Sequence, residues 1–169
     1  MVRASLRALA VAGVFTLLVA CTREAPAPAP STPLFYQSLD APAATIDAAT
    51  AAEMISAYRA NQGLGPLAVD PALEADARAA AEAMAAADRP ASGDVLRKKL
   101  AAEGIPSPAV NLSAGYRTLA EAFSGWRDSP AHKRVMLASS ATRLGIATAY
   151  APRSKYKVYW ALIVAGPRR

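Results

Sequence analysis

Residues 157–165 read Lys-Val-Tyr-Trp-Ala-Leu-Ile-Val-Ala, and this stretch decides the fold. After Lys157, the side chains that alternate between the two faces of an extended chain are apolar on both faces. A strand of this kind is typical of the middle of a sheet that is covered on both sides. The stretch therefore predicts a central strand with a layer of other elements on each face.

Helical patterns dominate the chain before this strand. Asp47, Asp70 and Thr118 each stand where an N-cap is expected, and Pro71 suits a first helical turn. The expected helices span residues 47–62, 70–88, 94–103, 118–127 and 129–137, and the expected strands span residues 110–115, 144–150 and 157–165. Helices followed by a small sheet predict an α+β fold, a three-layer α-β-α sandwich with a small central sheet.

The N-terminus has the pattern of an export signal. Arg3 and Arg7 precede an uncharged apolar run from Ala8 to Ala20, and Cys21 follows. The run is shorter than the about 20 residues that a membrane-spanning helix needs, and it has the length of a signal-peptide core. It resembles the bacterial lipobox, in which the cysteine is acylated with fatty acids such as palmitate. Residues 1–20 are therefore predicted to be a lipoprotein signal peptide, with an ordinary secretory peptide or an uncleaved anchor as the alternatives.

The segment after the predicted lipidation site is rich in alanine and proline. We expect residues 21–45 to be the lipidated Cys21 and an extended linker, because proline blocks helix and sheet pairing. At ~3.1 Å per residue, it could span on the order of 70 Å. Leu34, Phe35 and Tyr36 form an apolar island that could dock on the domain. Residues 46–169 are predicted to be that domain.

Charge is distributed unevenly along the chain. Residues 127–169 carry nine lysines and arginines and one acid, whereas residues 21–126 have more acidic than basic residues. A basic region favours anionic partners. For an exported protein we expect anionic lipid or an acidic cell-wall polymer rather than nucleic acid, with a solvated face that has no partner as the alternative.

Several segments in order resemble the CAP superfamily, which comprises cysteine-rich secretory proteins, antigen 5 and plant pathogenesis-related proteins. The resemblance is to its small bacterial, SCP-like branch and covers residues 48–166. The segments that carry it are 58–67, 70–73, Asn111-Leu112, Trp126-Arg127-Asp128-Ser129-Pro130-Ala131-His132-Lys133, 144–147 and Tyr159-Trp160.

The resemblance implies a cleft around His132. Trp126 and Trp160 would be buried plugs, Ser129 would cap the helix that presents His132, and Asn111 would brace loops through its side chain, with an Asx turn as the alternative for Asn111. The family cleft often holds two histidines and two glutamates that bind a metal.

That ligand set is depleted in this chain. His132 is the only histidine, and Val110 stands where the family has a glutamate. A zinc site generally needs three or four protein ligands. Glu121 or Asp128 could accept a hydrogen bond from His132, but we expect no metal and no cofactor.

Two functions remain open from the sequence. One is a non-enzymatic binding or scaffolding module of the cell envelope with a degenerate metal cleft. The other is a cell-wall or peptide hydrolase with His132 as general base. Thr22 follows Cys21, which in a Gram-negative organism resembles sorting to the outer membrane, facing the periplasm.

Overall fold

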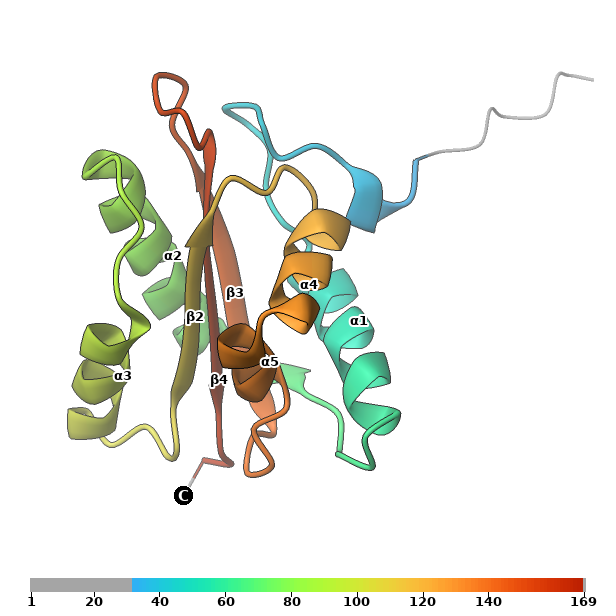
Figure 1. Cartoon of the computed structure of the whole chain (residues 1–169). Helices are drawn as coiled ribbons and strands as arrows, with labels where there is room; N and C mark the ends of the chain where they lie inside the picture. Colours follow the sequence, from blue (N-terminus) through green and yellow to red (C-terminus); the bar gives the residue numbers. More distant parts are fainter. Residues whose placement is uncertain (1–31, 169) are drawn as a thin grey trace, which may run out of the picture. The chain divides into compact units, whose positions relative to one another are not determined.

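The computed structural model describes residues 32–168 (Figure 1). Its elements, in chain order, are η1 (Leu34–Tyr36), α1 (Ala48–Ala60), β1 (Ala68–Val69), α2 (Pro71–Ala86), α3 (Gly93–Ala102), β2 (Ala109–Ala114), α4 (Leu119–Asp128), α5 (Pro130–Met136), β3 (Arg143–Tyr150) and β4 (Val158–Ala165). The predicted signal peptide and Cys21 lie outside the described residues. No helix within 32–168 is long and apolar enough to cross a membrane.

The four strands form one sheet in the order β1-β3-β4-β2. β4 pairs antiparallel with both β3 and β2, and β1 pairs parallel with β3. All eight residues of β4 are buried. The prediction of a central strand covered on both faces is confirmed.

Helices cover both faces of the sheet. α1, α4 and α5 lie on one face, and α2 and α3 lie on the other (Figure 1). Each face has its own apolar core, with Trp126 and Trp160 in the first and Leu73 and Leu100 in the second. The three-layer α-β-α sandwich is therefore confirmed.

The contact between α2 and β3 depends on one glycine. A Cβ placed on Gly145 would lie 2.1 Å from the backbone carbon of Leu73. No side chain fits in that space, so the backbones of α2 and β3 approach each other closely. The small alanine side chains on the buried side of α2 also allow this close approach.

Most helix starts follow their predicted caps. The side chains of Asp47, Asp70 and Thr118 accept hydrogen bonds from backbone N–H groups of α1, α2 and α4. α3 begins one residue earlier than expected, because Ser92 rather than Asp94 is its N-cap. α2 ends two residues early, before Asp88 adopts a left-handed backbone with φ of 49°.

The segment 32–45 is packed on the domain, so the prediction of an extended linker is wrong for these residues. Leu39 is buried in the core, and its N–H donates to the carbonyl of Arg117 at 2.7 Å. Phe35 packs against the same core from η1, which fits the expectation that this island docks. The folded unit starts at Thr32 rather than at residue 46. Pattern analysis missed this because prolines around a few apolar residues are typical of both linkers and docked loops.

Candidate functional site: the groove at His132

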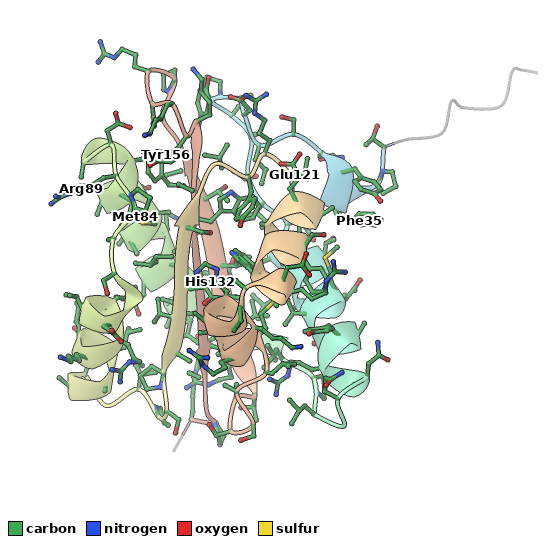
Figure 2. The ribbon with its side chains drawn as sticks, viewed as in Figure 1. Phe35, Met84, Arg89, Glu121, His132 and Tyr156 are labelled. Carbon is green, nitrogen blue, oxygen red and sulfur yellow. The ribbon has the colours of Figure 1, made fainter. Side chains whose placement is uncertain are left out.

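A groove of about 480 Å³ lies along β2, between the first turn of α3 and α5. Figure 2 shows His132 on α5, beside β2. β2 forms the floor of the groove through residues 109–112. Polar side chains reach it from three elements: Ser92, Asp94 and Arg97 at α3, Asn111 on β2, and His132 and Arg134 on α5.

Asn111 is the buried polar residue of the floor. Its side chain is 1% exposed, and its Nδ2 donates to the backbone carbonyl of His132 at 3.0 Å. This bond ties α5 to β2. Asn111 lies within a strand, so its side chain braces α5 against β2 and does not form an Asx turn. Its Oδ1 is also buried but has no partner among residues 32–168. An unpaired buried acceptor costs about 1–3 kcal/mol, so this atom calls for an explanation.

His132 presents a second buried atom of this kind. Its Nδ1 is shielded from solvent and has no hydrogen-bond partner in the described part of the chain. Burial lowers the pKa of the ring below its ordinary value of 6.5. The imidazole is therefore neutral near pH 7, with one nitrogen that donates and one that accepts. It offers a ligand a hydrogen bond without a charge.

Positive charge lies at the rim of the groove. Arg97 pairs with Asp94 at 3.3 Å, and both side chains are well exposed. Arg134 is exposed and forms no ion pair within residues 32–168. A surface pair such as Arg97–Asp94 contributes little to stability. Arg134 is therefore the cation that the described fold leaves available to a ligand.

The two carboxylates expected near His132 lie elsewhere. Glu121 accepts a hydrogen bond from the backbone N–H of Arg117 at 2.6 Å, at the start of α4. Asp128 pairs with Arg127 at 2.9 Å, and the hydrogen bond from Arg127 lowers the pKa of the Asp128 carboxyl. Neither lines the groove. The expectation that one of them accepts a hydrogen bond from His132 is therefore not met.

The groove lacks the donor set of a metal site. Within residues 32–168, no three histidine, cysteine, aspartate or glutamate side chains come together in a way that could hold a metal ion. His132 and Asp94 are its titratable side chains that could serve as ligands. Two ligands fall short of the three or four that zinc generally takes. The residues present do not fit the metal implied by the resemblance.

The two tryptophans form the support behind the groove. Their rings meet edge to face with centroids 5.8 Å apart. Trp126 Nε1 donates to Ser113 Oγ at 3.1 Å, and Trp160 Nε1 donates to the carbonyl of Tyr116 at 2.8 Å. Both are fully buried, so they are plugs in contact with β2 and its following loop, as the sequence implied.

The serines near the groove do not form a pair with His132. Ser129 occupies the N-cap of α5, but its side chain makes no capping hydrogen bond, so the predicted side-chain cap is wrong. Pro130 occupies the first turn, where a missing N–H costs little, and its fixed φ favours the helix start. Ser113 already accepts from Trp126. No hydrogen bond joins the His132 ring to a serine among the described residues.

A buried arginine escaped sequence analysis altogether. Arg59 has no exposed surface, and its guanidinium donates to four backbone carbonyls, those of Gly65, Met136, Ala138 and Ala141, at 2.8–2.9 Å. It follows Ala51 and Ile55 at helical spacing along the buried stripe of α1. A charged residue that continues an apolar stripe is the signal that could have revealed it.

Asp70 forms the second buried polar cluster. Its carboxylate, 2% exposed, pairs with Arg143 and with Arg168, the latter at 2.8 Å. Burial alone would raise the pKa of Asp70, but the hydrogen bonds from Arg168, Arg143 and the first turn of α2 outweigh it and lower the pKa to about 2. The cluster joins the start of α2 to β3 and the C-terminal segment.

Comparison with known proteins identifies the family and the fold. The Cysteine-rich secretory protein family (CAP) matches residues 52–164. A search of curated proteins gave no match. Similar solved structures include a cysteine-rich secretory protein from Staphylococcus aureus (20% identity, TM-score 0.57, 70% of this chain and 38% of that one) and an SCP-domain extracellular protein from Bacillus anthracis (18%, 0.58, 70% and 40%).

An outer surface protein from Borrelia burgdorferi is also similar, with 16% identity, a TM-score of 0.60, and coverage of 74% of this chain and 98% of that one. This chain spans about two fifths of the length of the first two proteins. Identities this low establish a shared fold. Because the family match covers more than half of the sequence, the chain belongs to the CAP, or cysteine-rich secretory protein, family.

Proposed function

We propose that this protein is a non-enzymatic binding module of the bacterial cell envelope, anchored through lipidated Cys21, whose ligand occupies the groove at His132. The similar solved proteins are described as secretory, extracellular or outer surface proteins. The signal-like residues 1–20 and Cys21 point to the same side of the membrane. A diacyl or triacyl anchor would hold the domain firmly at a membrane surface.

One observation carries the binding proposal. Asn111 Oδ1 and His132 Nδ1 are both buried without partners within the described fold, residues 32–168, and both residues line the same groove. Buried polar atoms in native proteins nearly always have partners. A bound ligand with N–H or O–H groups would supply them by turning these two side chains toward the groove. Arg134 adds a positive charge at the rim, so the ligand that fits best also carries negative charge.

The basic C-terminal third supports an envelope location for the ligand. Arg134 belongs to it, as do Arg153 and Lys155 in the exposed turn between β3 and β4. Anionic lipid and acidic cell-wall polymers are the envelope components that such residues attract. Residues 21–126 are acidic overall, so the excess of positive charge belongs to the C-terminal third of the sequence.

The hydrolase alternative has less support from the groove. A general base needs a partner that orients it and a proton that it can reach. His132 has neither a carboxylate nor a serine bonded to its ring among residues 32–168. A lowered pKa would suit a base, but without those partners it indicates a buried, neutral ring.

The binding proposal is tested by sedimentation with isolated envelopes. The chain without residues 1–20 and with Cys21→Ser would be mixed with envelopes, and bound protein would be measured at several concentrations. Asn111→Leu should reduce binding at least fivefold, and the matched control Ser124→Ala, outside the groove, should leave it unchanged. Equal binding of Asn111→Leu and the parent chain would refute the proposal.

Hydrolysis is tested in the same preparation. Release of soluble peptide or sugar from the envelopes should stay at the level of the blank for both the parent chain and His132→Ala. Release that depends on His132 would favour the hydrolase instead.

Anchoring is tested by metabolic labelling in bacteria. The full-length protein should incorporate an alkynyl palmitate, and Cys21→Ala should lose the label completely. A label that persists in Cys21→Ala would contradict lipidation at this residue.

A further inference from the structure

The floor of the groove is an unpaired sheet edge. β2 stands at one end of the strand order, so only one of its sides pairs with a neighbour in the described sheet. In Figure 1 this edge lies between the two helical layers. The N–H and C=O groups on an unpaired side are available to another extended chain.

The register shows which backbone groups point outward. The N–H of Gly115 donates to the carbonyl of Val158, so the backbone groups of Gly115 point toward β4. Ser113 and Asn111, two and four residues earlier, lie opposite Trp160 and Leu162, and their backbone groups point the same way. In an antiparallel pair, residues that bond to the partner alternate with residues whose groups point away from it. The outward residues of β2 are therefore Val110, Leu112 and Ala114.

Leu112 is the outward residue of the groove whose carbonyl has no such close neighbour as Gly93 is to Val110. The carbonyl of Val110 is approached by Gly93, whose Cβ would lie 3.0 Å from it. Apart from the β2–β4 ladder, no hydrogen bond within residues 32–168 uses the N–H or C=O of Leu112. The groove thus contains an unpaired donor and acceptor on the backbone, next to the orphaned atoms of Asn111 and His132.

The two walls beside this edge differ in chemistry. On the α5 side lie His132 and the unpaired cation Arg134. On the α3 side lie Ser92 and the ion pair of Arg97 with Asp94. Beyond them, a mainly apolar pocket of about 300 Å³ between α2 and α3 adjoins the groove and shares Ala91, Ser92 and Leu112 with it. Met84 and Leu96 line that pocket. Side chains of an added strand alternate between these two walls.

We propose that the groove binds an extended peptide segment of a partner protein, which adds to β2 as a further strand and alternates acidic with apolar side chains. Its backbone pairs with Leu112. Its acidic side chains face Arg134, and its apolar side chains enter the pocket beside Leu112. Strand addition draws affinity from backbone hydrogen bonds and specificity from alternate side-chain sites. This inference rests on the proposed function and names the class of ligand.

Charge argues for a peptide rather than a second copy of the chain. Two β2 edges paired about a twofold axis would bring the same patch of each copy face to face. Arg134 would then meet the positive rim of its counterpart, and like charges disfavour such a pair. α3 and α5 also flank the edge closely, which leaves room for one strand more readily than for a second sheet with its own helices.

The test uses the full-length protein in detergent and the acetylated, amidated pentapeptide Glu-Leu-Glu-Leu-Glu as the probe. Binding is followed by fluorescence anisotropy of a labelled probe, and its location by hydrogen exchange. The expected result is saturable binding with slowed exchange in residues 109–114. A probe with Lys in place of Glu should not bind, and sedimentation should show that the protein remains monomeric.

Two controls separate strand addition from simple charge attraction. Two N-methylated probes remove backbone donors without altering the protein, one methylated at residues of odd position and the other at residues of even position. The probe whose methyl groups replace the N–H groups that face β2 should bind about tenfold more weakly. Arg134→Glu should weaken binding at least tenfold, whereas Arg127→Glu, outside the groove, should change it less than threefold.

Three outcomes would overturn the inference. These are equal affinity for both N-methylated probes and the parent probe, protection outside residues 109–114, and a dimer whose β2 is protected without any probe. If the probe fails to bind but Asn111→Leu still loses envelope binding, strand addition is wrong while the proposed function stands. If both fail, the groove is not a binding site.

Discussion

Two regions of this molecule bury polar side chains, and they differ in whether those side chains have partners. The first comprises two clusters, where the guanidinium of Arg59 meets four carbonyls and the carboxylate of Asp70 meets two arginines. Its one buried atom without a partner among residues 32–168 is Nη2 of Arg143. Asn111 and His132 lie in the other, where each has a buried atom without a partner. Both regions connect segments that are far apart in the sequence.

The difference separates structural from functional polar groups. Groups that are fully paired within the fold offset their own desolvation and hold segments together. Groups left unpaired in a groove cost stability, and a ligand or a water that binds there can complete them. Arg59 and Asp70 are therefore expected to matter for stability, and Asn111 and His132 for binding. Substitutions in the first region should reduce stability more than binding, and substitutions in the second should reduce binding more than stability.

The largest effect is expected at Arg59. Arg59→Met keeps the apolar stem but leaves four carbonyls without their donor, and should lower the free energy of unfolding by roughly 3–5 kcal/mol. Urea denaturation measures this loss. The control Arg127→Met, at an exposed site, should change stability by less than about 0.5 kcal/mol. Similar small losses for both variants would contradict a structural role for Arg59.

The next effect is expected at Asp70. The pKa of its carboxyl is lowered from 3.8 to about 2, which corresponds to about 2 kcal/mol of stability. Because the folded pKa is the lower one, this stability is present above about pH 4 and disappears as the pH falls toward 2. Asp70→Asn can still cap α2 but cannot pair with Arg143 or Arg168.

The measurement for Asp70 is the unfolding free energy between pH 6 and pH 2. The parent chain should lose stability more steeply than Asp70→Asn below about pH 4. Parallel curves for the two proteins would show that the ion pairs contribute nothing.

A smaller effect on stability is expected at Asn111. Asn111→Leu removes the hydrogen bond to His132 but also removes the unpaired Oδ1, so the two changes offset each other. Unfolding in urea should show a change within about 1 kcal/mol. A loss as large as that of Arg59→Met would place Asn111 among the structural groups and remove the contrast between the two regions.

The smallest effect is expected from the titration of His132. Burial lowers its pKa below 6.5, so the unfolded chain takes up a proton more readily than the folded one. Stability should therefore decline as the pH falls below about 6.5, and His132→Gln, which cannot titrate, should flatten this part of the curve. Thermal unfolding between pH 7.5 and pH 5 checks the slope. Identical slopes would mean that protonation of the ring costs nothing.

The layers of the fold were predictable because they depend on local patterns. The apolar faces of 158–165 indicated the central strand, and Asp47, Asp70 and Thr118 marked helix starts. The two-residue strand β1 was missed because Ala68–Val69 is too short to show any alternation. The docking of Leu39 was missed because its hydrogen bond to Arg117 joins segments far apart in the sequence.

The site was predictable only in part. His132 and Asn111 were singled out from a resemblance, and the structure places them together in one groove. Arg97 and Arg134 were not identified as groove residues, because the fold alone brings the starts of α3 and α5 to the same edge of β2. Three of the four partners of Arg59 lie 77–82 residues away along the chain. All four are backbone carbonyls, which no residue type in the sequence reveals.

The most direct test compares Asn111→Leu with Asp70→Asn for both stability and envelope binding in one preparation. Asn111→Leu should keep its unfolding free energy within about 1 kcal/mol of the parent and bind envelopes at least fivefold more weakly. Asp70→Asn should lose about 2 kcal/mol and, at a temperature where it remains folded, bind as the parent does. If binding falls in proportion to stability in both variants, the groove has no role of its own and the account is wrong.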